Sequence, residues 1–287
     1  MIVVNGRRLA AGEAAIDPAD RGLLLGDGLF ETLPVFGGIA FRLEDHLDRL
    51  ARACAVLGIP VERARWAETI ALLAASADPA GGVVRLTVTR GPGPRGVKPP
   101  AEPRPTVIGT LAPWSPAIVF QTVRLATVSI RRNDRSPVSR LKALGYLDAI
   151  LGLAEAEAKG ASEPLFLNTA DRMACTAMAS VFAVFGDRIV TPPVEAGVLP
   201  GIARALVLGA GSIAGRPVVE ADLSPEDLGD AEALFLTNSV RFVLPVAECD
   251  SRPFADHAVA RAALDLMATA VEADCGLDPL ATVQRTT

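Results

Sequence analysis

The sequence predicts a mixed α+β fold of two domains, and three observations lead to that prediction. The chain has 287 residues, and a domain usually holds about 100–200 residues. Stretches with helical spacing of apolar residues occur among short strand-like runs in both halves. A proline-containing break, PWSPA, lies at residues 113–117 and marks a candidate linker. We therefore expect a small N-terminal α/β domain over residues 1–114 and a larger, β-rich domain with flanking helices over residues 115–287.

Spacing and turn residues define the expected elements of the first domain. Apolar residues recur every three or four positions from Glu44 to Leu57, and Gly58 follows them, which predicts a helix. A second helix is expected over residues 63–75. The run VVRLTVTRG alternates apolar and polar side chains, which predicts a half-buried strand. The expected strands are residues 1–8, 37–43, 83–91 and 106–111, with a proline- and glycine-rich loop at 91–105.

The second domain is expected to be rich in strands. The expected strands are residues 118–130, 164–168, 181–185, 188–191 and 232–246. A helix is predicted over residues 143–159, with Gly160 as a natural C-cap. The segment 197–211 is expected as a tight loop that leads into a helix, and a final amphipathic helix is expected over residues 255–275.

Composition restricts the classes of function. Half of the residues are apolar, which is enough for a sizeable core and excludes global disorder. The 28 basic and 33 acidic side chains give a formal net charge of −5. Because no basic surplus is available to neutralise phosphates, the chain is not expected to bind nucleic acid. No uncharged apolar run reaches the roughly 18 residues that a membrane-spanning helix needs, so no membrane span is expected.

The cysteines and the first residues indicate a compartment, and the histidines bear on metal binding. The four cysteines are far apart and form no CxxC pair, which is typical of reduced thiols in a cytosolic protein. His46 and His257 are too few and too distant for a metal cluster, so no metal is expected. Residues 1–17 lack the basic and apolar regions of a signal peptide. We expect a cytoplasmic globular protein.

Lysine is scarce, which makes each lysine informative. The three lysines are Lys98, Lys142 and Lys159. The first lies in the proline- and glycine-rich loop and the third beside Gly160, where solvation is expected. Lys142 lies where an arginine-rich segment leads into an apolar stretch; burial near other cations would lower its pKa and suit it to form a Schiff base. Its position alone is also consistent with a lysine at a helix start whose ammonium group extends into solvent, and this is the more common case.

Three further features could bind a ligand, and each also has an ordinary structural explanation. GVLPGIAR (197–204) presents free amides at a helix N-terminus, a geometry that binds phosphate, although many loops enter helices in this way. Arg49 lies beside the apolar stripe of its helix and could contact an anion or simply be exposed. Thr237, Asn238 and Ser239 interrupt an apolar strand and need partners, either backbone or ligand.

Six segments, taken in order, resemble the class IV aminotransferase family, the fold-type IV enzymes that use pyridoxal 5'-phosphate (PLP). This family includes branched-chain and D-amino-acid aminotransferases and 4-amino-4-deoxychorismate lyase. The segments are DRGLLLGDGLFET (20–32), EDHLDRL (44–50), RLKALGYLDAILGLAEAEAKGA (140–161), EPLFLN (163–168), GVLPGIAR (197–204) and FLTNSVRFVLPV (235–246). The resemblance implies a two-domain fold-type IV architecture, PLP as the cofactor and, as is usual in the family, a homodimer.

The resemblance implies a role for each residue that matches a cofactor-binding position of the family. Lys142 would carry PLP as a Schiff base and act as acid and base at the substrate carbon. The phosphate would be bound by Arg49, by the backbone amides of Ile202 and Ala203, and by Ser239. Family members usually have threonine where Ala203 stands, so one hydroxyl contact is expected to be missing.

The resemblance also implies contacts to the cofactor ring and to the substrate. Tyr146 matches a position that, in some members, hydrogen-bonds the phenolate oxygen of the cofactor. Arg95 matches the loop arginine that binds the substrate carboxylate in D-amino-acid aminotransferases, although Val97 stands where those enzymes have a histidine. Phe30 and Arg85 are expected to face the substrate.

Cys175 is the largest departure from the family pattern. It occupies the place of the glutamate that keeps the pyridine nitrogen of PLP protonated, within RMACTAMASVF (172–182). A thiol near its reference pKa cannot hold that proton as a carboxylate does, so the carbanion on which transamination depends should be less stabilised. Cys175 therefore favours a lyase, a slow transaminase or a site in which another group substitutes.

The predicted function is a PLP-dependent amino transfer from an α-amino acid to a 2-oxo acid. One alternative is 4-amino-4-deoxychorismate lyase, in which Lys142 removes the α-proton and pyruvate leaves to give 4-aminobenzoate. A second alternative is a non-catalytic homologue that binds PLP or a related phosphate. The expected partners are small-molecule amino acids and 2-oxo acids.

Overall fold

The computed structural model describes residues 1–10, 12–13 and 15–281, which form two compact units. Of the described residues, the first unit comprises those within 1–116, 141–145 and 271–281. The second comprises residues 117–140 and 146–270. The five residues 141–145, which include Lys142, therefore group with the first unit although the residues on both sides of them belong to the second.

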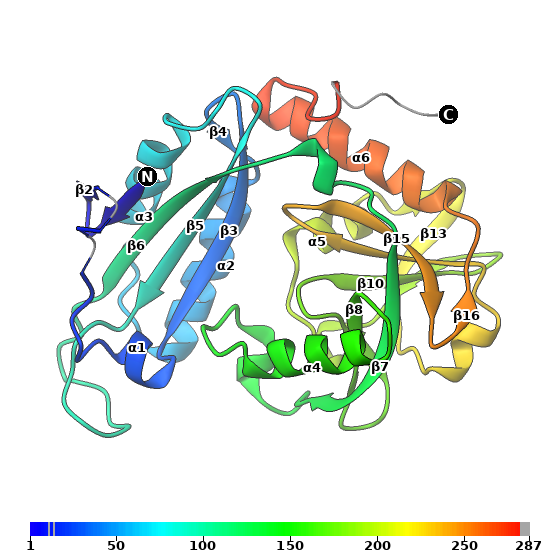
Figure 1. Ribbon diagram of the computed structural model, residues 1–287, viewed down its shortest axis with the longest axis horizontal. Coiled ribbons are helices and arrows are strands. Elements are labelled where there is room, and N and C mark those ends of the chain that lie inside the picture. Colours follow the sequence, from blue (N-terminus) through cyan, green and yellow to red (C-terminus); the bar gives the residue numbers. More distant parts are fainter. Residues whose placement is uncertain (11, 14, 282–287) are drawn as a thin grey trace. The chain divides into compact units, whose positions relative to one another are not determined.

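The first unit is built on a six-stranded antiparallel sheet (Figure 1). Its strands are β1 (Ile2–Val4), β2 (Arg7–Leu9), β3 (Gly28–Phe36), β4 (Ile39–Ala40), β5 (Gly82–Thr89) and β6 (Thr106–Pro113). They lie in the order β2-β1-β6-β5-β3-β4. The helices of this unit are α1 (Arg21–Leu25), α2 (Leu43–Leu57) and α3 (Arg63–Ala74).

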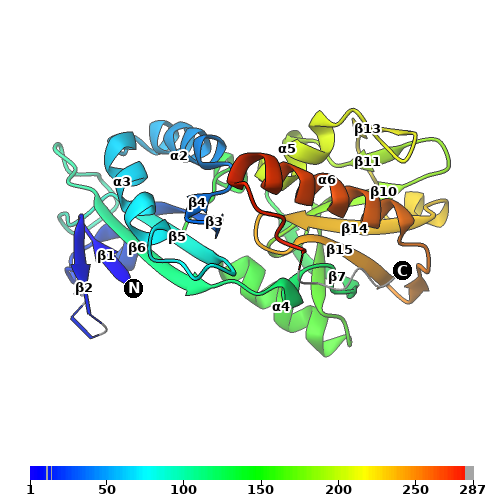
Figure 2. The ribbon, with the colours of Figure 1, turned by 90° about the horizontal axis from the view of Figure 1, so that it is seen from above.

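Helices α2 and α3 cover one face of this sheet (Figure 2). Leu50 and Trp66 pack with Val84, Leu86 and Val88 in one core, whereas Arg85 on the same strand is exposed. The alternation along β5 thus places its apolar residues against the helices. The helices predicted at 44–57 and 63–75 and the strand predicted at 83–91 are confirmed as α2, α3 and β5, with ends shifted by one or two residues.

Three features of the first unit differ from the expected elements. Residues 1–8 were expected as one strand, but Asn5 and Gly6 have positive φ and turn the chain between β1 and β2. Strand β4 covers only two of the seven residues expected at 37–43. Strand β3 was not expected, because eight of its nine residues are buried and the alternation that marks a half-exposed strand is absent.

The second unit contains the longer sheet, whose path is β12-β13-β11-β10-β14-β15-β7-β8-β9, with β16 paired to β15. Its strands are β7 (Val123–Arg132), β8 (Glu163–Asn168), β9 (Met173–Cys175), β10 (Ser180–Val184), β11 (Ile189–Thr191), β12 (Ser212–Ile213), β13 (Arg216–Glu220), β14 (Ala233–Asn238), β15 (Phe242–Cys249) and β16 (Arg252–Pro253). The core of this sheet includes Phe182 and Phe235, whose rings stack with centroids 4.9 Å apart.

Two helices of the second unit hold segments of the predicted site. They are α4 (Leu147–Ala158), which packs on β7 and β8, and α5 (Ile202–Gly209), which contacts β13 and β14. A third helix, α6 (Ala258–Cys275), ends in the first unit. Short 3-10 turns occur at Pro116–Ile118, Pro137–Arg140, Val194–Ala196 and Glu226–Gly229.

Three expected elements of the second half are corrected. The single strand expected at 232–246 is the hairpin of β14 and β15, because Asn238 Oδ1 accepts from the amides of Val240 and Arg241 and closes a turn. The helix expected from residue 143 begins at Leu147. The strand expected from residue 118 begins at Val123, after a 3-10 turn.

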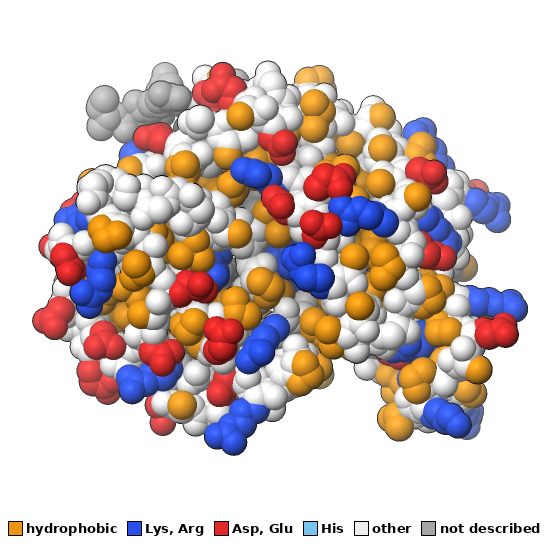
Figure 3. Space-filling view, turned by 180° about the vertical axis from the view of Figure 1, so that it is seen from behind, with side chains coloured by type: hydrophobic (Ala, Val, Ile, Leu, Met, Phe, Trp, Pro, Cys, Tyr) orange, Lys and Arg blue, Asp and Glu red, His pale blue; other side chains and the backbone are white. Residues whose placement is uncertain are grey.

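The surface shows no segregation of charge on the face that Figure 3 presents. There, acidic and basic side chains of the described residues lie interspersed with apolar ones. Among the described residues, no helix has the length and apolar character needed to cross a membrane.

Candidate active site

Lys142 is held against the sheet of the first unit rather than at a helix start. The amide of Phe30 donates to the Lys142 carbonyl at 2.9 Å, and the amide of Leu144 donates to the Gly28 carbonyl at 3.1 Å. Residues 142–144 therefore run beside the start of β3. The expectation of a lysine at the first turn of a helix is wrong, because α4 begins five residues later.

The surroundings of Lys142 disfavour its protonated form. Its Nζ lies 4.3 Å from the centroid of the Phe30 ring, and the Arg85 guanidinium lies 3.7 Å from the same centroid. Burial, followed by the positive charges of Arg49 and Arg85, lowers the pKa of Lys142 to about 8, against an opposing effect of Glu31. These are the causes that the sequence argument required for a reactive amine.

A buried carboxylate on β3 organises the basic groups near Lys142. Glu31 accepts two hydrogen bonds from Arg49, one from Nε at 2.8 Å and one from a terminal nitrogen at 2.6 Å. It also lies 2.7 Å from Nδ1 of His46. Burial raises the pKa of Glu31, but the charge and hydrogen bonds of Arg49 and the hydrogen bond of His46 outweigh it and lower the pKa to about 2. Glu31 is therefore ionised.

His46 and Arg49 lie one turn apart on α2 and both point into the protein. Their residues are 1% and 6% exposed, so the interpretation of Arg49 as an exposed helix arginine is wrong. Burial lowers the pKa of His46 and outweighs Glu31, which leaves a neutral ring with Nδ1 as the donor to Glu31. Nε2 of His46 is buried without a partner among the described residues.

Glu31 was not predicted from the sequence as a member of this cluster. The available signal was the single carboxylate within the otherwise uncharged strand GLFETLPVF, since a buried carboxylate requires a cationic partner. That signal names no partner, because Arg49 lies 18 residues away on a helix.

The three residues expected to face the substrate lie in the first unit, on two strands and a loop. Phe30 on β3 is buried, and Arg85 on β5 is exposed. The structure brings both into contact, through the Arg85 guanidinium over the Phe30 ring. Arg95 lies on the 91–105 loop and is exposed. The carboxylate-binding role of Arg95 stays a prediction.

The second unit holds the predicted phosphate-binding amides at the start of α5. Gly201 is the N-cap, with φ −70° and ψ 137°, and its side chain cannot cap the helix. The first amides of a helix have no partner within it, and those of Ile202 and Ala203 belong to this set. Ser239 lies in the turn between β14 and β15 and is half-buried. The phosphate-binding roles of these residues stay predictions.

Tyr146 and Cys175 also lie in the second unit. Tyr146 is the N-cap residue of α4. Cys175 ends β9, pairs with Phe166 and Ser180, and is 9% exposed. Burial raises the pKa of the Cys175 thiol, and the charge of Arg132 only partly opposes this. The thiol is therefore protonated at neutral pH and carries no charge with which to hold a proton on a pyridine ring.

The sequence matches the amino-transferase class IV family over residues 28–249. It is 32% identical over 254 residues to a candidate branched-chain-amino-acid aminotransferase of Methanocaldococcus jannaschii, covering 88% of each chain. Structurally it resembles 4-amino-4-deoxychorismate lyase from Pseudomonas aeruginosa, with a TM-score of 0.83 and 31% identity, covering 96% of this chain and 100% of that one.

A third relative extends the likeness of fold. A hypothetical aminotransferase from Mycobacterium tuberculosis, solved in a PLP-bound form, superposes with a TM-score of 0.85 over 96% of this chain and 99% of that one. Its sequence identity is 22%, so it supports the fold alone. The expected α+β, fold-type IV architecture is confirmed by these structures.

Proposed function

Because the chain belongs to the class IV aminotransferase family, a family of PLP-dependent enzymes, we propose that it transfers an amino group from an α-amino acid to a 2-oxo acid with PLP held on Lys142. The observation that carries the proposal is the lowered pKa of that lysine, about 8. At pH 7 roughly a tenth of such an amine is neutral, about 300-fold more than for an ordinary lysine. A neutral amine is the form that attacks a carbonyl carbon.

By residue type, the positions that the family resemblance assigns to PLP suit its aldehyde and its phosphate. Lys142 supplies the amine. Arg49 and the uncapped amides at Ile202 and Ala203 are donors of the kind that binds a phosphate dianion. Ser239 adds a hydroxyl. These assignments follow the family resemblance. The assignment of Arg49 is also supported by its buried guanidinium, which Glu31 orients.

PLP, when bound, supplies an electron sink for the carbanion at the substrate Cα. The protein then has three tasks that its own residues can perform. Lys142 Nζ removes and returns the proton at Cα, and a pKa near the working pH suits it to both directions. Phe30 covers the amine with an apolar ring. Arg95 binds the substrate carboxylate and thereby orients Cα.

Cys175 limits this chemistry. A neutral thiol hydrogen-bonds a ring nitrogen weakly and gives it no formal proton. We expect slow amino transfer, and we expect Cys175→Glu to change the rate rather than the binding of PLP. Tyr146 is proposed to hydrogen-bond the ring oxygen.

The first experiment is the visible absorption spectrum of the protein purified with PLP, for the wild type and Lys142→Ala. A yellow wild type and a colourless variant are expected, together with complete loss of turnover, because the variant lacks both the covalent link and the proton carrier. Lys159→Ala is the matched control, since Lys159 is partly exposed and pairs with Glu155. A Lys142→Ala protein with the wild-type band would contradict the proposal.

A paired assay separates amino transfer from the alternatives. D-alanine, L-leucine and L-glutamate are each offered with a 2-oxo acid, and bleaching of the band names the donor. Aminodeoxychorismate is offered without an acceptor, and release of pyruvate would identify the lyase instead. The non-catalytic alternative predicts a bound cofactor and no turnover in either assay.

We also propose a cytoplasmic homodimer. In the first unit, Leu23, Leu24 and Leu25 of α1 are 65%, 58% and 50% exposed. Three consecutive exposed leucines are unusual on a monomer surface and typical of an interface. Light scattering of the purified chain tests the proposed dimer, and a monomeric mass would contradict it.

A further inference from the structure

The loop at residues 91–105 has almost no regular structure, yet its first residues are bound to the start of α1 and to the segment just before it. The amide of Arg21 donates to the Gly91 carbonyl at 3.0 Å, and the amide of Gly93 donates to the Ala19 carbonyl at 3.2 Å. These contacts fix where the loop leaves β5. They do not reach its middle, where Arg95 lies.

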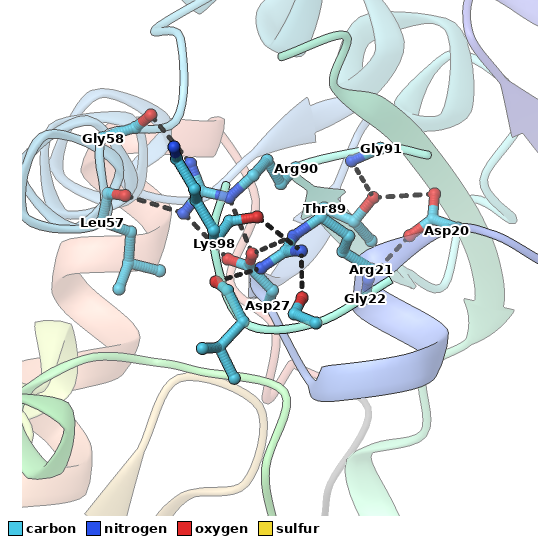
Figure 4. A network of polar contacts seen from close by, with 12 residues as sticks. Asp20, Arg21, Gly22, Asp27, Leu57, Gly58, Thr89, Arg90, Gly91 and Lys98 are labelled. Carbon is cyan, nitrogen blue, oxygen red and sulfur yellow. Dashed lines mark hydrogen bonds and ion pairs between the residues drawn. The ribbon is translucent and has the colours of Figure 1, made fainter. Parts of the chain in front are cut away.

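The side chain of Arg21 holds the middle of the loop (Figure 4). One terminal nitrogen donates to the Gly96 carbonyl at 2.9 Å and to the Lys98 carbonyl at 3.3 Å, and the other donates to the Val97 carbonyl at 3.0 Å. Its Nε donates to Asp27 at 2.8 Å. The side chain is 4% exposed, so one buried guanidinium binds three consecutive carbonyls that follow Arg95.

Two glycines let the loop close over this side chain. Gly91 has φ +85°, and a Cβ there would lie 1.8 Å from the Arg104 carbonyl oxygen. The two ends of the loop thus meet at a point where only glycine fits. A Cβ at Gly93 would lie 2.9 Å from Cδ of Arg21, so the loop backbone rests directly on the arginine side chain.

Arg90 shares the same carboxylate but serves a different element. It donates to both carboxylate oxygens of Asp27, at 2.7 and 3.0 Å, and its terminal nitrogens donate to the carbonyls of Leu57 and Gly58. Those carbonyls lie at the end of α2. Asp27 therefore orients two buried arginines, of which Arg21 binds the middle of the loop and Arg90 binds the helix.

We propose that Arg21 is a positioning residue that fixes residues 96–98, and with them Arg95, and so sets the affinity of the enzyme for the substrate carboxylate. The link to affinity rests on the proposed function, in which Arg95 binds that carboxylate. The fixing of the loop does not, because it follows from the three carbonyl contacts alone.

The loop offers a readout that is independent of activity. Trypsin does not cut before proline, and Pro99 and Pro105 follow Lys98 and Arg104. Within residues 92–105 the only bond open to trypsin is therefore Arg95–Gly96. The carbonyls that Arg21 binds lie on the C-terminal side of that bond, and a protease needs this stretch extended. The rate of cutting there thus reports how often the loop leaves Arg21.

Arg21→Lys keeps the charge beside Asp27 and removes the fork that binds three carbonyls. We expect cutting at Arg95 to become about tenfold faster. The KM for the amino acid should rise by about tenfold with kcat within about twofold, and PLP loading should stay unchanged. Arg90→Lys is the matched control and should leave both the cutting rate and KM near wild type.

Gly93→Ala provides a second variant that leaves the ion pair intact, should Arg21→Lys fold poorly. Its methyl group should lift the loop from Arg21 and accelerate cutting to a smaller degree. Wild-type cutting rates in both variants, or equal acceleration in Arg90→Lys, would overturn the proposal. Faster cutting with an unchanged KM would overturn the link to affinity. A wild type without turnover would count against the proposed function, and the cutting rates would still decide whether Arg21 fixes the loop.

Discussion

Two carboxylates of the first unit, the buried Glu31 and the partly buried Asp27, each bind two basic side chains, yet they act on different parts of the molecule. Asp27 pairs with Arg21 and Arg90. Glu31 pairs with Arg49 and lies against His46. The two carboxylates lie four positions apart in the sequence, and both sets of partners are almost fully buried.

The difference lies in what the remaining N–H groups of the basic partners bind. Arg21 and Arg90 donate to backbone carbonyls of a loop and of a helix end, so Asp27 organises the backbone. Arg49 and Glu31 both act on the pKa of Lys142, and Asp27 is not among the charges that do. The same ionic chemistry thus holds the backbone in one place and acts on the pKa of an amine in the other.

Glu31→Gln is expected to have the largest effect on stability, and it tests whether Glu31 acts on Lys142. It leaves the Arg49 guanidinium buried without its carboxylate, and breaking a buried ion pair in this way costs about 4 kcal/mol of unfolding free energy. Because the charge of Glu31 raises the pKa of Lys142, its loss should move that pKa below 8. Chemical denaturation measures the first effect. The pH dependence of acetylation at Lys142 in the protein without PLP, followed by mass spectrometry, measures the second.

Acid titration of the same variant supplies the control. The folded-state pKa of Glu31 is about 2, below its ordinary 4.5. Its contribution to stability is therefore fully present above pH 4.5 and is lost as the pH falls toward 2. The wild type should lose about 3 kcal/mol over that range through this group. Equal acid sensitivity in wild type and Glu31→Gln would show that Glu31 is not the ionised partner.

Asp27→Asn should lower the unfolding free energy less than Glu31→Gln does, and it should not change the pKa of Lys142. The carboxylate is 13% exposed, and water can partly solvate the freed arginines, so we expect a loss of about 2 kcal/mol. The pKa of Lys142 should stay at about 8. Denaturation and the same acetylation profile give both values, and a shifted profile would mean that the two clusters are coupled.

Arg85→Gln should have the smallest effect on stability and a defined effect on reactivity. Arg85 is exposed, and removing its charge should change the unfolding free energy by less than about 0.5 kcal/mol. Because that charge lowers the pKa of Lys142, the pKa should rise above 8, opposite in sign to the change in Glu31→Gln. The midpoint of the rate against pH should move upward with it. A midpoint that stays in place would exclude Arg85 from the site.

Much of the fold could be predicted from the sequence where periodicity was clear. Helices α2 and α3, strand β5 and the 91–105 loop lie close to their expected positions. Strand β3 could not be predicted, because a strand buried on both faces shows no alternation. The hairpin at 238–242 was missed for a local reason, since an asparagine that closes a turn reads like any polar interruption.

The candidate site likewise has one part that could be predicted from the sequence and one part that could not. From the sequence alone, Lys142 is predicted as the reactive amine, through the scarcity of lysine and the order of the six family segments, and Arg49 is predicted as a phosphate ligand by its family position. The family resemblance also predicts that Cys175 stands where other members have a carboxylate. These are properties of residue type and order along the chain, which the sequence records directly.

Only the tertiary structure decided what surrounds Lys142. Residues 141–145 leave their neighbours in the chain and pair with β3, which brings the amine near Glu31, Arg49 and Arg85. The partners lie between 57 and 111 residues away in the sequence. A pKa depends on the distance to charges and on burial, and both follow from how the chain packs rather than from the spacing of its residues.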